Sequence, residues 1–217
     1  MSQTSQVFAS SNYPPDEAAA ERFVSEMRHG TLVAGSAEGY PQVSILPFVK
    51  TGDSIELHCV QDDPTFAAVL ANPRVTFLVS DFLAWSPHDW ADTQDAGRAT
   101  LHFRAVAFEC DVERTSTDPN DVAGALSRLL RAYEPGASYK PVEMGEFYGP
   151  RLRRLATMRL QIIRRHIKFK TGPAGTPETK RKVAGRLRER GRPGDIRAAD
   201  IIEAAAKKSE RNVTPTN

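Results

Sequence analysis

A period of two in the pattern of apolar residues constrains the fold of this chain more than any other feature. It occurs in three successive segments, 31–36, 42–50 and 54–61, and the short sequences between them contain glycine. In a strand, alternate side chains lie on opposite faces, and tight turns with glycine join neighbouring antiparallel strands. The three segments therefore predict an antiparallel meander.

The rest of the chain continues this pattern with longer strands and short helices. Further strands are predicted at 74–85, 99–114 and 156–170, and helices at 16–29, 63–72, 119–134, 176–191 and 198–210. Residues 74–85 are nearly all apolar, so this strand is expected at the centre of the sheet. Six strands in meander order with helices between them predict an α+β, mainly β domain, a small antiparallel barrel flanked by helices.

Composition places this domain in the cytoplasm and away from membranes. No run of 18 apolar residues is present to span a bilayer, and the N-terminal sequence lacks the basic and apolar regions of a secretory signal. Cys59 and Cys110 fall in predicted strands, where they are expected as buried thiols of a reducing compartment. We expect the chain to be organised as a disordered segment at 1–12, one barrel domain at 13–192, and a C-terminal helix and tail at 193–217.

Positive charge is concentrated in one part of the sequence. Residues 151–192 contain 15 Lys and Arg against two acidic residues, Glu178 and Glu189, whereas the formal net charge of the whole chain is only +2. This asymmetry fits a surface for an anionic partner, such as a phosphate group, a nucleic acid or the acidic part of a second subunit. A solvated basic face explains the same pattern.

Polar and aromatic side chains near the ends of the predicted strands are candidates for a site. They are Ser44, His58, Trp85, Ser86, His88, Trp90, Thr100, His102, Lys168 and Lys170. The set lacks paired carboxylates, a hydroxyl–base–acid constellation and metal-ligand spacing, so it predicts neither hydrolysis nor a metal site. It suits a phosphorylated planar molecule, because lysines and hydroxyls bind phosphate and indoles pack against rings. Packing alone is the competing explanation for the tryptophans and histidines.

Six motifs follow one another along residues 12–190. They are NYPP (12–15), GTLVAGSAEGYPQVSILPF (30–48), LHCVQDDPTF (57–66), AWSPHDW (84–90), TLHFRAVAFE (100–109) and IKFKTG (167–172). In order and spacing they resemble the motifs of the PaiB-type proteins, FMN-binding negative transcriptional regulators of the FMN-binding split-barrel superfamily. The resemblance implies a split β-barrel and a homodimer with FMN at the interface.

The resemblance also implies roles for individual residues. FMN would be bound by Ser44, His58, Gln61, Thr65, Trp85, Ser86, Trp90, Thr100, Lys168 and Lys170, and a proton would be donated near the flavin by His88 or His102. The chain departs from the family at Ile45, Gln61 and Asp63 and at residues 171–173. An arginine lost at Gln61 and an aspartate gained at Asp63 weaken the attraction for a phosphate.

Three functions remain open at this point. The first is a flavin-dependent oxidoreductase that acts on a small molecule. The second is a PaiB-like transcriptional regulator without catalytic turnover, which would bind nucleic acid through residues 151–192. That segment shows no helix-turn-helix pattern, so indirect regulation is favoured over direct DNA reading. The third is a haem-binding split barrel, with an axial ligand among His58, His88 and His102.

Overall fold

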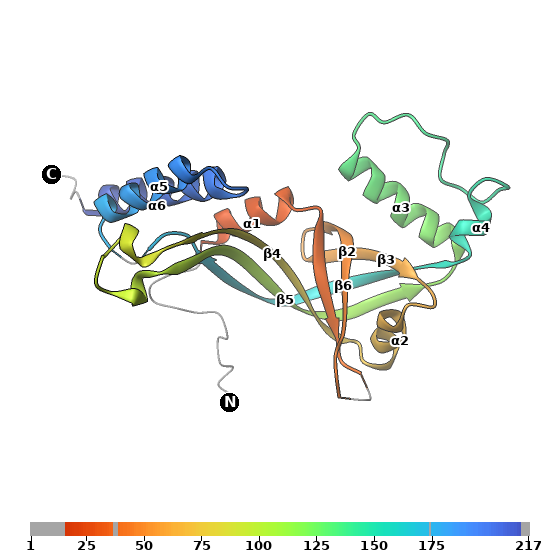
Figure 1. Cartoon of the computed structure of the whole chain (residues 1–217). Coiled ribbons are helices and arrows are strands. Elements are labelled where there is room, and N and C mark those ends of the chain that lie inside the picture. The colour runs from red at the N-terminus through yellow and green to blue at the C-terminus, as the bar shows by residue number, and fades with distance from the viewer. Residues whose placement is uncertain (1–15, 37–38, 174, 214–217) are drawn as a thin grey trace. The chain divides into compact units, whose positions relative to one another are not determined.

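This computed structural model describes residues 16–36, 39–173 and 175–213. These residues contain six strands and six α-helices (Figure 1). The strands are β1 (His29–Ala34), β2 (Gln42–Thr51), β3 (Ser54–Val60), β4 (Arg74–Ser86), β5 (Thr100–Ser116) and β6 (Leu155–Lys170). The helices are α1 (Glu17–Glu26), α2 (Pro64–Ala71), α3 (Pro119–Tyr133), α4 (Gly149–Leu152), α5 (Pro177–Arg190) and α6 (Asp195–Val213), with two short 3₁₀ turns, η1 (His88–Trp90) and η2 (Ala96–Arg98). Every predicted helix and strand is therefore present, and only α4, η1 and η2 are additions. The segment 1–12 and the NYPP motif lie outside the described residues.

The strand order differs in one respect from the prediction. β1, β2 and β3 form the expected antiparallel meander. The continuation in meander order is wrong, because β4 pairs with β1 and β6 pairs with β3. The order β1-β2-β3-β6-β5-β4 closes on itself as a barrel. The two meanders are joined at both edges, where β1 covers 75–78 of β4 and β3 covers 155–161 of β6, and this removes sites of unwanted strand pairing there.

Alternation along the strands fills the barrel with apolar side chains. In β4, Val75, Phe77 and Val79 are buried, and the ring of Phe77 meets Phe48 of β2 edge to face at 5.2 Å. Beyond Val79 the alternation breaks, since Leu83 and Ala84 are both buried, whereas Phe82 is 65% exposed and Trp85 is 48% exposed. Although the sequence of β4 is nearly all apolar, two of its aromatic side chains are therefore exposed within one chain.

The chain divides into two compact units, and the boundaries fall inside β4, β5 and β6. The barrel unit consists of Glu17–Val79 and Val106–His166, and it holds β1 to β3 and α1 to α4. The helical unit consists of Asp16, Ser80–Ala105 and the described residues from Ile167 onward, and it holds η1, η2, α5 and α6.

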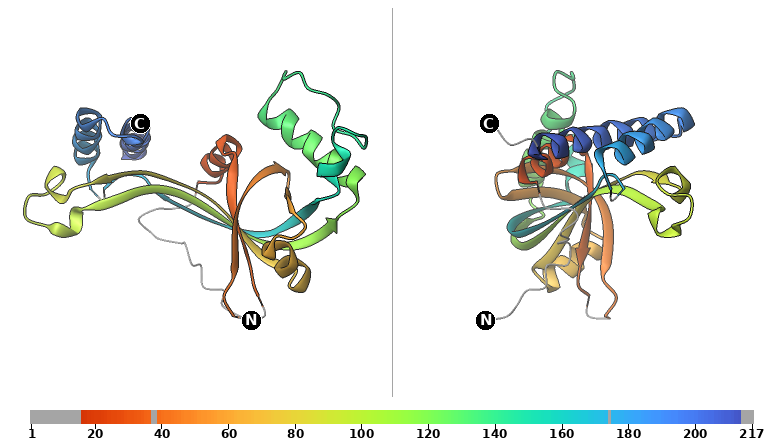
Figure 2. Two further views of the ribbon diagram at one scale, coloured as in Figure 1. Left: turned by 45° about the vertical axis from the view of Figure 1, so that its right-hand side comes forward. Right: turned by 90° about the vertical axis from the view of Figure 1, so that its left-hand side faces the viewer.

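The helical unit has its own apolar core. Helices α5 and α6 lie side by side (Figures 1 and 2), and their buried residues form a cluster with two residues of β4. The cluster consists of Leu83, Ala84, Val183, Ala184, Leu187, Ala198, Ala199 and Ile202. In the described part of the chain, no helix has both the length and the apolar sequence that a bilayer crossing requires.

Gly194 is required where the turn before α6 meets β4. Its φ of +88° is unfavourable for other residues, and a Cβ there would collide with the backbone carbonyl of Leu83. We expect Gly194→Ala to lower the free energy of unfolding by about 2 kcal/mol or more, from strain and displaced packing. Urea denaturation measures this change.

The matched control is Gly185→Ala in the middle of α5. A Cβ at Gly185 meets nothing within 4 Å, so this variant should gain about 0.5–1 kcal/mol from helix propensity. Equal effects of the two substitutions would show that the turn does not need glycine.

Candidate functional site

The predicted site residues divide between the two units. The barrel unit contains Ser44, His58, Gln61 and Thr65, and the helical unit contains Trp85, Ser86, His88, Trp90, Thr100, His102, Lys168 and Lys170. Within the units, the structure brings together two groups, Ser44 with Thr65 and Ser86 with His102.

Ser44 and Thr65 meet at the start of α2. Their hydroxyl oxygens are 2.6 Å apart, and Thr65 is buried. Asp63 caps this helix, because its carboxylate accepts a hydrogen bond from the Thr65 N–H at 2.8 Å. The Asp63 carboxylate is therefore engaged in capping α2. The hydroxyl groups of Ser44 and Thr65 are the polar pair beside it.

His58 and Gln61 have other surroundings. On β3, Ile55, Leu57 and Cys59 are buried inside the barrel, so His58 faces outward, where burial lowers the pKa of its imidazole. The side-chain amide of Gln61 donates to the carbonyl oxygens of Arg153 and Leu155, at 3.0 Å each. Gln61 therefore joins the end of β3 to the start of β6, a structural role that differs from the predicted contact with a cofactor.

Ser86 and His102 form the most deeply buried polar group of the helical unit. The hydroxyl of Ser86 lies 2.9 Å from Nε2 of His102, and the backbone N–H of Gly172 donates to Nδ1 at 3.1 Å. Because Nδ1 accepts a hydrogen bond, the proton of the neutral ring resides on Nε2, which then donates to Ser86. This tautomer excludes His102 as a base for Ser86. It leaves the hydroxyl proton of Ser86 free to donate to a third group.

The charge state of His102 follows from its position. Burial lowers the pKa of His102 to about 4, and the positive charges of Lys170 and Arg190 act in the same direction. His102 has no exposed surface in this chain. At neutral pH it is an uncharged hydrogen-bond donor of fixed orientation, and the predicted role as an acid is not supported by this geometry. Of the two predicted catalytic histidines, His88 is the one that is partly exposed, in η1.

Arg190, the last residue of α5, positions the segment WSPHDW. Its Nη1 donates to the carbonyl oxygen of Trp85 at 2.7 Å, and its guanidinium lies 4.9 Å from the ring centroid of Trp90. The same guanidinium makes two hydrogen bonds to Asp195, at 2.8 and 2.6 Å, and Asp195 is 1% exposed. The carboxylate of Asp195 thus orients a cation that contacts both tryptophans.

Sequence reasoning missed Arg190 because it lies about a hundred residues beyond the tryptophans. The one signal in the sequence was its place at the end of a predicted basic helix, directly before Gly191. The other predicted residues of this unit, Thr100, Lys168 and Lys170, are buried or half-buried along β5 and β6.

Most of the arginines that created the charge asymmetry have partners within the chain. Arg188 pairs with Asp200 at 2.7 Å and with Glu203, and Arg181 pairs with Glu210. Each pair joins α5 to α6. Part of the positive charge of this segment is thus neutralised by the following helix.

The fold has relatives among solved structures. The flavocytochrome Anf3 from Azotobacter vinelandii is 19% identical over 76% of this chain and 72% of that chain, with a TM-score of 0.59. A FAD and heme binding protein from Mycobacterium smegmatis is 15% identical over 76% of both chains, with a TM-score of 0.56. A conserved hypothetical protein from Mycobacterium tuberculosis is 18% identical over 74% of this chain and 88% of that chain, with a TM-score of 0.50.

The chain has the split-barrel fold. No model of a known protein family matches the sequence. No curated protein matches it either. In the described ranges, no three His, Cys, Asp or Glu side chains lie together in a way that would bind a metal ion.

The pKa of His102 predicts a loss of stability in weak acid. Its folded-state value of about 4 lies below the ordinary value of 6.5, so the unfolded chain binds a proton that the folded chain rejects. The contribution of neutral His102 is complete above pH 6.5 and is lost as the pH falls toward 4. Over this interval we expect about 3 kcal/mol to be lost from the free energy of unfolding.

The variant His102→Gln separates the pH-dependent contribution of His102 to stability from that of the carboxyl groups, which also titrate in this range. Urea denaturation at pH 7 and pH 4 should show a smaller loss in the variant, by about 3 kcal/mol. Equal losses in both proteins would show that folding does not lower the pKa of His102.

Proposed function

We propose that this protein binds a flavin, with FMN as the expected form, and that it is an oxidoreductase acting on a small molecule. The observation that carries the proposal is the buried Ser86–His102 pair beside the positive charges of Lys170 and Arg190. Two further points support it. Solved proteins with this fold include a flavocytochrome and a FAD and heme binding protein, and the sequence motifs resemble those of FMN-binding split barrels.

The residues of the helical unit fit such a ligand. The hydroxyl proton of Ser86 is available to a phosphate or carbonyl oxygen, and Lys170 supplies positive charge in the same region. The half-exposed indole of Trp85 offers an apolar face for a ring. When bound, the flavin supplies the redox chemistry, and the chain binds it, orients it and excludes water. His88, which is partly exposed, is the residue proposed to deliver a proton.

Flavin uptake by the purified protein tests the proposal. The protein is mixed with excess FMN or FAD and filtered, and the absorbance spectrum is recorded. We expect flavin bands to be retained, with FMN bound more tightly than FAD. A protein that retains neither flavin would overturn the proposal, and a single Soret band from the purified protein would assign haem instead.

Lys170→Gln should weaken FMN binding about tenfold, because a charge-assisted hydrogen bond contributes roughly 1.5–3 kcal/mol. Fluorescence titration of FMN measures the change. Lys182→Gln is the control, since Lys182 is exposed on α5 in the same unit. Equal weakening by the two substitutions would assign the effect to net charge and remove Lys170 from the site.

We also propose a homodimer in the cytoplasm, in which the outward face of β1, β2 and β4 is covered by the partner. On this face Val43 is 59% exposed and Ile45 is 70% exposed. The strand register extends the apolar surface sideways, because Val43 pairs with Val33 and Ile45 pairs with Thr31, which pairs with Leu78 of β4. An apolar surface that crosses three strands is typical of a protein interface.

Ile45→Glu should convert the dimer to a monomer in analytical ultracentrifugation, because the substitution buries an unpaired carboxylate in the interface. Leu70→Glu on α2 is the control, since Leu70 is 59% exposed on a different element. A monomeric wild-type protein, or a dimer unchanged by Ile45→Glu, would contradict the proposed interface.

The alternative of a nucleic-acid-binding regulator has less support, since Arg181 and Arg188 of the basic helix α5 pair with carboxylates of α6.

A further inference from the structure

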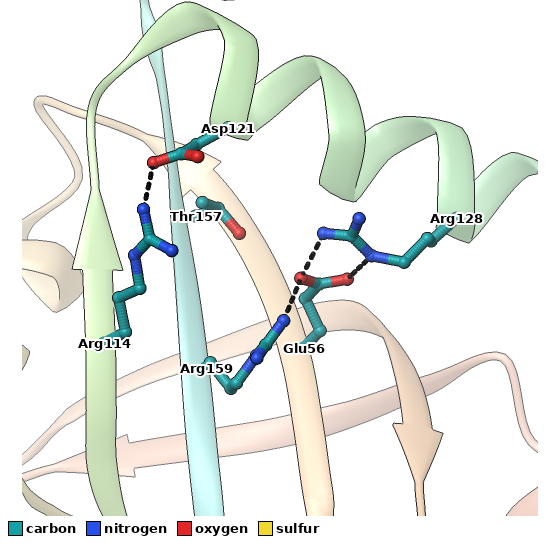
Figure 3. A pocket seen from close by; sticks show the side chains of 6 residues that line it. All are labelled: Glu56, Arg114, Asp121, Arg128, Thr157 and Arg159. Atoms are coloured by element: carbon teal, nitrogen blue, oxygen red, sulfur yellow. Dashed lines mark hydrogen bonds and ion pairs between the residues drawn. The ribbon is translucent and has the colours of Figure 1, made fainter.

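A second polar site lies on the outside of the barrel unit, between α3 and the strands β3, β5 and β6 (Figure 3). It consists of two adjoining pockets that share Glu56, Arg128 and Arg159. One pocket is completed by Arg114, Asp121 and Thr157. The other has a volume of about 260 Å³ and is completed by Val49, Thr51 and Ser54. None of these residues belongs to the flavin site proposed above.

The arginines of this site form ion pairs of different length. Glu56 accepts two hydrogen bonds from Arg128, at 2.7 and 2.6 Å, and these bonds lower the pKa of its carboxyl. Arg114 pairs with Asp121 at 2.6 Å. Arg159 is held only loosely, because its Nη2 lies 3.7 Å from the same Glu56 oxygen that Arg128 contacts. Three guanidinium groups therefore surround two carboxylates, and Arg159 is the cation with the weakest partner.

Hydroxyl groups complete a set of donors around Arg159. Thr51 and Ser54 line the larger pocket, whereas Thr157, which lies between Arg114 and Glu56 in Figure 3, donates its hydroxyl proton to the Leu57 carbonyl at 3.0 Å. Arg159 is opposite Glu56 in the strand register, so it extends from β6 across the outer face of the sheet. Guanidinium and hydroxyl donors together match the tetrahedral oxygens of phosphate.

We propose that this outer pocket binds the phosphate group of a small molecule, with Arg159 as the main contact. The ligand carries at least two negative charges, because a singly charged anion gains little against the nearby carboxylates of Glu56 and Asp121. The phosphate oxygens replace Glu56 as the ion-pair partner of Arg159. Arg128 keeps its two hydrogen bonds to the Glu56 carboxylate. A volume of about 260 Å³ accommodates a phosphate group with several waters. The proposal does not depend on flavin binding.

Isothermal titration calorimetry with inorganic phosphate and pyrophosphate tests the site, at an ionic strength held constant with sodium chloride. We expect both anions to bind, pyrophosphate more tightly because of its larger charge. Arg159→Gln should raise the Kd of pyrophosphate at least about tenfold. Glu56→Gln should lower the same Kd several-fold, because it removes a competing carboxylate and keeps an oxygen for Arg128.

Arg164→Gln is the matched control. Arg164 lies on the same strand, is 45% exposed where Arg159 is 47% exposed, and pairs with one carboxylate at 3.3 Å. It should leave the Kd unchanged. The proposal is overturned if pyrophosphate gives no heat beyond the chloride control, if the two arginine variants lose affinity equally, or if Glu56→Gln weakens binding. FMN uptake by Arg159→Gln should equal that of the wild type, and its loss would assign the pocket to the flavin.

Discussion

Pairing of β3 with β6 and of β1 with β4 is the constraint on which the rest of the barrel unit depends. These contacts join residues far apart in the sequence, as where the hydroxyl of Thr157 donates to the Leu57 carbonyl 100 positions earlier. Loop entropy opposes such closure, and burial of the alternating apolar side chains in the ring offsets it. Closure also assigns each side chain to the inside or the outside. It places Glu56 and His58 on the outside of the barrel, where Glu56 contacts Arg128 of the outer helix α3.

In the helical unit, burial and hydrogen bonding act together on one histidine. A buried imidazole is tolerated when both ring nitrogens have partners, and Gly172 and Ser86 provide them for His102. The same burial keeps the ring neutral. A neutral ring of fixed tautomer is a weak acid but a good orienting group for Ser86. The chemistry proposed for this unit therefore needs a ligand with its own reactivity, which a flavin provides.

The arginines of this protein serve three different purposes. Arg181 and Arg188 of α5 join this helix to α6 through surface ion pairs, each of which contributes little stability. Arg190 is held by the buried carboxylate of Asp195 and contacts both tryptophans. Arg159 has a loose partner and lies in a pocket with hydroxyl groups. Net charge along the sequence does not distinguish these purposes. The distance to the nearest carboxylate distinguishes Arg159, and the burial of the partner carboxylate distinguishes Arg190.

The sequence by itself determined the secondary structure. Alternation with a period of two located all six strands, and the Asp63-Pro64 pair located the start of α2, because these signals depend on neighbouring residues. It also located Ser86 and His102 as polar residues next to apolar strands. Strand order was decided by tertiary structure, since many edge pairings satisfy the same alternation. The tertiary structure likewise decided the tautomer of His102, the role of Arg190 and the outer pocket around Arg159, because each depends on contacts between residues distant in sequence.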